Sequence, residues 1–259
     1  MTRFKSKVAL VMGGSTGIGA ATTRAFAREG ARVAIASDLS LDQSAPLREE
    51  LRAEGADVRN YQCDISDAAA VARLIGAVKA DFGRIDVAAN CAGWAPPDRL
   101  YESDPEVARR VYEVNAIGPY YFVQALAPVM RDQGGGNIVL VASASGVLGT
   151  TQISAYCASK AGVIQLARGL VQELKGSRIR LNCIAPGLTR TPMTAWLDED
   201  GAEAYREKLK SIIPSPYDDP WLEAGDQAEV ILFLASDAAK AVHGHCILTD
   251  QGMTTSMPS

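Results

Sequence analysis

The sequence lacks the features that mark a membrane-spanning or disulfide-stapled protein. No apolar run approaches the ~20 residues that cross a bilayer. The first run, Val8 to Met12, is also too short for the core of a signal peptide. The cysteines form no C-x-x-C pair, and each lies in or beside an apolar run, as small buried thiols do. We therefore expect a cytoplasmic protein with no membrane partner.

The sequence is also poor in histidine and in net charge. His243 and His245 are its two histidines and no third ligand accompanies them, so we expect no metal site. A net charge of -4 gives no electrostatic reason to expect nucleic-acid binding. The chain of 259 residues is 47% hydrophobic, which is enough for a large core. We expect a small-molecule substrate as its partner.

Short β-rich runs alternate with amphipathic helical patterns along the chain. The runs are apolar on both faces, which predicts a parallel sheet covered by helices on both sides. No linker or repeat interrupts the pattern, so we expect one domain over residues 1–259, with a Rossmann-type, doubly wound, three-layer α/β fold. The predicted strands are Val8–Met12, Arg32–Ser37, Asp57–Cys63, Ile85–Asn90, Asn137–Ala142, Arg178–Ile184 and Cys246–Thr249. The predicted helical segments are Ile18–Glu29, Ser44–Glu54, Asp67–Phe82, Asp104–Asp132, one around Tyr156 that Gly176 would stop, and Gln227–Ala235.

A glycine-rich loop, residues 12–19, joins the first predicted strand to the first helix. Glycines let a ligand approach the backbone and a helix N-terminus offers free N–H groups, so this loop is typical of a pyrophosphate site. A P-loop is excluded because Ala20 stands where the phosphate-binding lysine is required. A serine-hydrolase elbow centred on Ser15, with His243 or His245 as base, fits the spacing. However, no earlier strand–helix loop precedes it to supply the second oxyanion donor. We therefore favour a dinucleotide loop.

Tyr156 and Lys160 lie four residues apart in a helical pattern and so share one face. Free tyrosine titrates near ~10, and a neighbouring ammonium lowers its pKa. Ser143 lies upstream at the end of an apolar run. Alcohol oxidation needs a base for the hydroxyl proton and a donor for the oxygen, and these residues offer both. Taken alone, the Tyr-x-x-x-Lys spacing also fits an exposed lysine beside a core tyrosine.

With these features the chain resembles, nearly end to end, a single-domain short-chain dehydrogenase/reductase. The likeness rests on Met12-Gly13-x-x-x-Gly17-x-Gly19, Asp64, Asn90-Cys91-Ala92-Gly93, Asn115, Ser143, Tyr156-x-x-x-Lys160 and Asn182-Cys183-Ile184-Ala185-Pro186-Gly187, in that order. Two positions depart from the family pattern: Met12 replaces a usual threonine and Cys91 a usual asparagine. We expect both departures to alter hydrogen bonds that tether loops, rather than the chemistry.

The resemblance implies hydride transfer between a nicotinamide and a carbonyl carbon, with Tyr156 as the proton acceptor or donor. It implies that Ser143 binds the substrate oxygen and Lys160 lowers the pKa of the tyrosine and binds the nicotinamide ribose. Asn115 would hold a water that relays protons. A carboxylate at Asp38 would meet the adenosine ribose, although an aspartate there could equally be a turn residue or a helix cap. The expected cofactor-binding residues are Gly13, Ser15, Thr16, Gly17, Ile18, Gly19, Asp38, Asp64, Ile65, Asn90, Gly93, Tyr156, Lys160, Pro186, Gly187, Thr189 and Thr191.

Residues from about 193 to 221 contain three prolines, follow Pro192 and break the alternation, and we expect this stretch to cover the substrate. The expected substrate residues are Trp94, Ser145, Val147, Met193 and Trp196, with Tyr217 and Trp221 as further candidates. Ordinary surface packing is the alternative for each aromatic residue. The aromatic residues favour a cyclic or otherwise apolar secondary alcohol or ketone.

We expect NAD as the cofactor, because no lysine or arginine lies between Arg32 and Arg48 to bind a ribose phosphate. The alternatives are an NADPH-dependent 3-ketoacyl-type reductase, a serine hydrolase using Ser15, and a non-catalytic dinucleotide-binding regulator. Apolar residues on more than one face of the segments starting at Asp104 and Ser154 leave a face uncovered. The family resemblance implies that these helices pair in a homotetramer.

Overall fold

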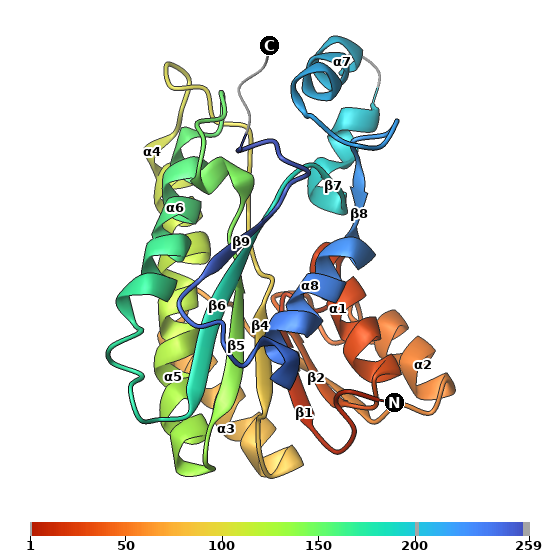
Figure 1. Cartoon of the computed structure of the whole chain (residues 1–259), viewed down its shortest axis with the longest axis vertical. Helices are drawn as coiled ribbons and strands as arrows, with labels where there is room; N and C mark the ends of the chain where they lie inside the picture. The colour runs from red at the N-terminus through yellow and green to blue at the C-terminus, as the bar shows by residue number, and fades with distance from the viewer. Residues whose placement is uncertain (1, 200–201, 256–259) are drawn as a thin grey trace.

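A seven-stranded parallel sheet forms the centre of the molecule (Figure 1). The structure is a computed structural model and describes residues 2–199 and 202–255. The strand order is β3-β2-β1-β4-β5-β6-β9. The strands are β1 (Val8–Met12), β2 (Arg32–Ser37), β3 (Val58–Gln62), β4 (Val87–Asn90), β5 (Gly136–Val141), β6 (Ile179–Pro186) and β9 (Cys246–Thr249). The predicted Rossmann-type parallel sheet is confirmed.

Helices cover both faces of the sheet, and each face has its own apolar core. Successive residues of β1 alternate between them: Leu10 packs in one core and Val11 in the other. One layer contains α3 (Ala68–Phe82), α5 (Gly118–Asp132) and α6 (Ser154–Gly169). The other contains α1 (Gly17–Arg28), α2 (Ala45–Ala53) and α8 (Ala224–Ala235). This double burial explains why a central strand such as β1 is continuously apolar, whereas the edge strand β3 is not.

The direction of winding reverses between β1 and β4, which are neighbours in the sheet. The chain adds β2 and β3 on one side of β1, then crosses to build β4, β5 and β6 on the other. Met12 and Asn90, the last residues of the two strands, are register partners. In such sheets the loops that leave the two strands part in opposite directions and open a crevice at their carboxyl ends. A ligand site is therefore expected there.

The segment predicted as helical from Asp104 to Asp132 is one rod with a π-helical turn inside it. Asp104 begins it, because its side chain accepts the Glu106 N–H at 2.9 Å. The α-helix α4 (Pro105–Tyr112) passes into a π-helix (Glu113–Ile117) and then into α5. The wider turn carries Asn115, whose side chain is completely buried. A π-helical turn of this kind frequently marks a functional position.

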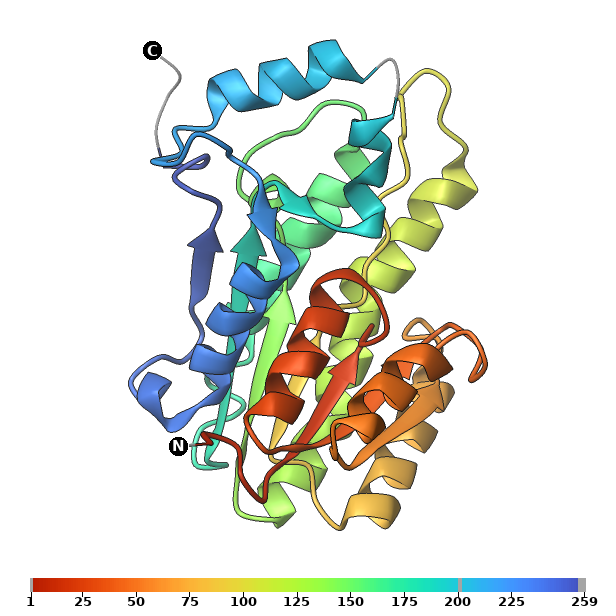
Figure 2. The ribbon, with the colours of Figure 1, turned by 90° about the vertical axis from the view of Figure 1, so that its right-hand side faces the viewer.

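A small upper layer lies over the carboxyl end of the sheet (Figures 1 and 2). It contains a two-stranded sheet, β7 (Thr189–Arg190) with β8 (Leu222–Glu223), a 3₁₀-helix (Pro192–Asp198) and the helix α7 (Glu203–Ile212). Leu197, Leu209 and Trp221 form its apolar cluster. The sequence pattern predicted an irregular stretch here, so α7 is a correction. The i, i+4, i+7 spacing of Tyr205, Leu209 and Ile212 in the sequence could have predicted this helix.

The predicted and observed elements differ mainly at their ends. The bounds of β1, β2 and β9 are those predicted, whereas α6 ends at Gly169 and turns follow to Arg178, well before the expected stop at Gly176. Among the described residues, no helix has the length and apolar character needed to cross a membrane.

Candidate active site

A cleft of about 1090 Å³ opens at the carboxyl ends of the strands. The loops that follow β1, β2, β3, β4, β5 and β6 line it, together with residues of the upper layer. Most of the residues expected at a site from the sequence are therefore brought together, although the first and last of them, Gly13 and Trp196, lie 183 positions apart. Within the described chain, Ser15, Gly19, Asn90, Asn115 and Val147 are expected residues that do not line the cleft.

The glycine loop fits a dinucleotide because its backbone passes other backbone at distances that only glycine allows. A Cβ atom on Gly13 would lie 2.6 Å from the Ala92 nitrogen, and one on Gly19 would lie 1.9 Å from the Gly13 oxygen. Gly17 has a φ of +51° and opens helix α1. The loop thus presents the N-terminus of α1 to the cleft, where free N–H groups favour an anionic group such as a diphosphate.

Ser15, expected to bind the cofactor, does not line the cleft. Its hydroxyl lies 2.9 Å from that of Ser37, at the end of β2. The hydrolase interpretation lacks its base, because His243 accepts the Leu181 N–H at 3.2 Å and neither histidine lines the cleft among the described residues. Ser15 therefore joins β1 to β2 rather than acting as a nucleophile. No group of three or more metal-ligating side chains gathers in the described part of the chain.

Two carboxylates line the far end of the cleft. Asp38 follows β2 and is exposed. Asp64 follows β3, and its carboxylate pairs with the guanidinium of Arg110 at 2.7 Å. Burial raises the pKa of Asp64, but the hydrogen bonds from Arg110 and Ser66 outweigh it, so the pKa lies below its ordinary value. Asp64 is therefore a carboxylate at neutral pH, as an acceptor for an amino group must be.

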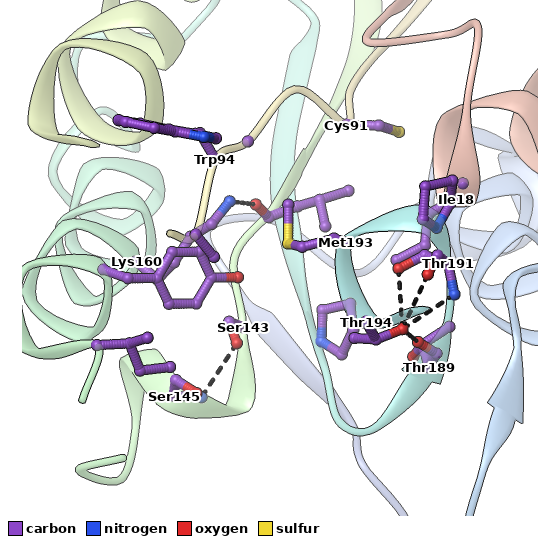
Figure 3. Close-up of a pocket in the computed structure, with 18 of the residues that line it drawn as sticks. Ile18, Cys91, Trp94, Ser143, Ser145, Lys160, Thr189, Thr191, Met193 and Thr194 are labelled. Carbon is purple, nitrogen blue, oxygen red and sulfur yellow. Dashed lines mark hydrogen bonds between the residues drawn. The ribbon is translucent and has the colours of Figure 1, made fainter. Parts of the chain in front are cut away.

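Tyr156, Ser143 and Lys160 line the other end of the cleft. Figure 3 shows Ser143 and Lys160. Burial raises the pKa of Tyr156, and a hydrogen bond with Ser143 opposes that rise. The Lys160 ammonium lies 5.7 Å from the centroid of the tyrosine ring and donates to the Val141 carbonyl at 2.9 Å. The expected lowering of the tyrosine pKa by Lys160 is thus not found in this structure, where burial is the larger effect. The phenol is protonated at neutral pH.

Asn115 lies behind these groups and binds the loop that carries Trp94. Its side-chain oxygen accepts the Trp94 N–H at 2.8 Å, and its amide donates to the Trp94 carbonyl at 2.8 Å. The same amide donates to the Ser159 hydroxyl at 3.2 Å. Gly93 lies beside it, where a Cβ would be 3.2 Å from the lysine nitrogen. Asn115 therefore fixes the backbone next to Lys160 rather than lining the cleft itself.

The loop after β6 brings Thr189 and Thr191 to the cleft in different ways. The Thr189 hydroxyl donates to the Gly187 carbonyl and accepts from Gln227, so it is already occupied. The Thr191 hydroxyl lies 3.3 Å from that of Thr194 (Figure 3). A carboxamide in this part of the cleft would thus meet the backbone near Thr189 and the hydroxyl of Thr191.

Apolar side chains form one wall of the cleft. Trp94, Met193 and Trp196 line it as predicted, and Ser145 lies at its polar edge. Figure 3 shows Trp94 on one side of Met193 and the Ser143–Ser145 pair on the other. Val147 and Tyr217 are exposed and lie outside the described lining, while Trp221 is buried beneath Arg190. Residues that the sequence did not single out complete the wall: Leu197, Tyr205 and Leu209.

The buried Lys160 generates a prediction about stability. Burial lowers its pKa from 10.5 to about 8, so below pH 8 folding must bury a charge. This cost is fully present below about pH 8 and fades as the pH rises towards 10.5, where the unfolded lysine also loses its proton. Lys160→Met should therefore raise the free energy of unfolding by about 1–3 kcal/mol at pH 7. Urea unfolding at pH 7 and pH 10 measures the effect, and the gain should shrink at pH 10.

Lys79→Met on the exposed side of α3 is the matched control, and it should change stability little at either pH. If Lys160→Met is no more stable than the parent at pH 7, then the buried ammonium is not a cost to the fold.

Comparison with known proteins agrees with this geometry. The family model described as "Enoyl-(Acyl carrier protein) reductase" matches residues 13–254. A 7alpha-hydroxysteroid dehydrogenase of Bacteroides fragilis is 35% identical, over 100% of this chain and 98% of its own length. A 3-oxoacyl-[acyl-carrier-protein] reductase of Thermotoga maritima is 38% identical, over 97% and 99%. The structure of a short-chain type dehydrogenase/reductase from Mycobacterium ulcerans superposes with a TM-score of 0.89 at 30% identity, covering 98% of this chain and 92% of that one.

The cleft has a glycine-rich loop at one end and a serine, a tyrosine and a lysine at the other. The relatives that match nearly the whole chain are dehydrogenases and reductases. The chain belongs to the short-chain dehydrogenase/reductase family.

Proposed function

We propose that the protein is an NAD-dependent oxidoreductase that interconverts a secondary alcohol and a ketone on a cyclic or otherwise apolar substrate. The observation that carries the proposal is the position of Ser143, Tyr156 and Lys160, which line the cleft between the glycine loop and the apolar wall. The free state of all five cysteines fits a reducing compartment, and we propose a cytoplasmic location.

Each of the three polar side chains has a separate task in this proposal. The Tyr156 phenol donates its proton to the carbonyl oxygen in reduction, and the phenolate accepts the alcohol proton in oxidation. The Ser143 hydroxyl donates to the same oxygen and holds it in place. Lys160 remains an ammonium below about pH 8, 5.7 Å from the centroid of the tyrosine ring, and its charge would oppose the rise in the tyrosine pKa that burial causes. The nicotinamide supplies or accepts the hydride when the dinucleotide is bound.

The residues that would hold the dinucleotide follow the cleft. The N-terminus of α1 would bind the diphosphate, Asp38 the adenosine ribose and Asp64 the adenine amino group. Lys160 would bind the nicotinamide ribose, and the Gly187–Thr191 segment the carboxamide. The carboxylates and the helix N-terminus have the donor and acceptor character that these groups need.

The substrate class is inferred from the wall. Trp94, Trp196 and Tyr205 offer flat apolar surfaces, and Trp196 and Tyr205 lie 5.7 Å apart between ring centroids. Apolar rings in such a pocket gain from burial and from stacking. The similarity to a hydroxysteroid dehydrogenase supports a bulky cyclic alcohol, although the identity of 35% leaves the wall free to differ.

Tyr156→Phe should reduce turnover by about 10²–10⁴-fold in both directions, because it removes the proton donor and acceptor. Cofactor affinity should stay within about threefold of the parent, since the ring remains. Turnover is followed by the absorbance of the reduced cofactor with a panel of cyclic secondary alcohols, and affinity by fluorescence titration. Tyr217→Phe loses the same hydroxyl outside the cleft and should keep full activity. Near-native rates in Tyr156→Phe would sink the mechanism.

Cofactor choice is proposed to depend on Asp38. A carboxylate would face the 2′-phosphate of NADP as a like charge, at a cost of about 4 kcal/mol for ~4 Å and an effective dielectric near 20. Asp38 is exposed, so solvent removes much of this. About 1.4 kcal/mol, a tenfold preference, should remain. The opposite preference would favour the 3-ketoacyl-type reductase, the alternative that the similarity to the Thermotoga maritima reductase keeps open.

We expect kcat/KM for NAD to exceed that for NADP by at least about tenfold. The double variant Asp38→Ala with Leu39→Arg should lower this ratio, because a guanidinium can bind the phosphate. Asp42→Ala, which removes an exposed carboxylate that does not line the cleft, should leave the ratio unchanged. A parent ratio at or below one, or no change in the double variant, would show that Asp38 is not the selector.

We also propose that the protein is a homotetramer. Tyr112, Ile117 and Tyr120 lie along the α4–α5 rod and are 41%, 41% and 45% exposed. Apolar side chains gathered in this way are usually covered by a partner. Light scattering should give a mass about four times the 27.4 kDa of the chain. Ile117→Glu should lower this mass, whereas Leu100→Glu, on an exposed loop elsewhere, should not. A stable monomer at micromolar concentration contradicts the proposal.

A further inference from the structure

The Arg110–Asp64 pair lies where α4 meets the end of β3, at the edge of the cleft. Three basic residues line the cleft within the described ranges: Arg99, Arg110 and Lys160. Lys160 lies beside Tyr156 and Arg99 follows the Trp94 loop, so Arg110 is the cation that meets the carboxylate. The side chains of Arg110 and Asp64 remain 38% and 41% exposed. Exposed ion pairs add little to stability, so the fold does not account for this one.

Arg110, Asp64 and Ser66 form a closed ring of hydrogen bonds. Arg110 donates from Nη2 to Asp64 Oδ2 at 2.7 Å and from Nη1 to the Ser66 hydroxyl. The Ser66 hydroxyl donates in turn to Asp64 Oδ1 at 2.7 Å, and the Ser66 N–H donates to the same oxygen at 2.9 Å. Both ends of the carboxylate are thereby held, and its plane cannot turn without breaking the ring.

The ring also decides which acceptor of Asp64 is left for a ligand. An ionised carboxylate has about four lone-pair sites, two on each oxygen. The two donors of Ser66 occupy Oδ1, and Arg110 occupies one site of Oδ2. One site on Oδ2 therefore remains, beside the guanidinium, on a carboxylate that lines the cleft. It can accept a single N–H, and it repels an oxygen.

We propose that Arg110 is a positioning residue that, together with Ser66, turns the Asp64 carboxylate into a single-acceptor site for the exocyclic amino group of adenine. The inference rests on the proposed function only in taking an adenine dinucleotide as the ligand. Arg110 also offsets the Asp64 charge. Without it, Asp38 and Asp64 would be two uncompensated carboxylates facing a diphosphate-bearing molecule.

The test compares NADH with its deamino form, in which hypoxanthine replaces adenine and an oxygen replaces the amino group. Fluorescence titration gives the dissociation constant of each, with no alcohol or ketone present. The parent should bind NADH at least roughly tenfold more tightly, because the deamino form loses a hydrogen bond to a charged acceptor and places an oxygen against it. Arg110→Gln should weaken NADH and lower this preference at least threefold, since Asp64 is then free to turn.

Three further variants separate positioning from a general structural effect. Arg109→Gln removes the neighbouring guanidinium, which pairs with Glu106 and does not line the cleft, and it should keep the parent preference. Arg110→Lys keeps the charge but not the two-pronged contact, and should give an intermediate preference. Asp64→Asn can donate to the hypoxanthine oxygen and should abolish the preference. Its result also shows whether the carboxylate is the group being read.

An equal affinity of the parent for the two dinucleotides overturns the inference, as does an unchanged preference in Arg110→Gln. Neither result bears on turnover, which Tyr156→Phe tests separately. Should the protein prefer the 2′-phosphorylated cofactor, the same comparison is made with NADPH and deamino-NADPH, because both carry the adenine end that Arg110 is proposed to serve.

Discussion

The buried ammonium of Lys160 is the constraint around which the catalytic end of the cleft is built. It is 3% exposed, and its nitrogen donates a hydrogen bond to the Val141 carbonyl at the end of β5. A single neutral acceptor does not repay the loss of hydration, which is why burial lowers its pKa to about 8. The fold tolerates this cost because two layered cores stabilise the sheet beneath it. Gly93 keeps the space beside the nitrogen free, where a Cβ would lie 3.2 Å away. A site that must receive another molecule next to a cation cannot also be filled by the protein.

The π-helical turn follows from the same constraint. Asn115 must reach both the N–H and the carbonyl of Trp94, as well as Ser159, from inside a helix. A polar side chain within a helix is costly unless it is fully paired, and here each of its polar atoms has a partner. Periodicity could not reveal this. The sequence from Asp104 to Asp132 has ordinary helical spacing on both sides of the turn, so it predicts one continuous helix. The wider turn is set by Trp94 and Ser159, which belong to other segments and are therefore absent from the local sequence.

Where a segment is buried on both faces of the sheet, its sequence was sufficient to predict a strand. The strands Val8–Met12 and Arg32–Ser37 have the predicted bounds because a parallel strand between two helical layers is largely apolar. The half-buried edge strand Cys246–Thr249 also has the predicted bounds. The sequence also predicted the close approach of the backbone at Gly13, where a Cβ atom would clash. The direction of individual side chains could not be predicted from the sequence. Ser15 faces Ser37 and Val147 faces solvent, although both lie in loops with the expected spacing. Loop spacing places a Cα, whereas the direction of its side chain depends on neighbours far along the chain.

The two ends of the cleft are formed by different residue types from different parts of the fold, and this limits which residues can be substituted without disturbing the sheet. Glycines, carboxylates and a helix N-terminus form the end that fits the dinucleotide, and they belong to the strands and loops of the main sheet. Part of the apolar wall, with Leu197 and Leu209, belongs to the small cluster of the upper layer, which is separate from both large cores. Substitutions in that cluster can reshape the wall without disturbing the packing of the sheet, because they share few contacts with it. Relatives with steroid and acyl substrates in their names are consistent with such a division. Selectivity for a particular alcohol is therefore expected to lie in the upper layer, and the chemistry in the sheet below.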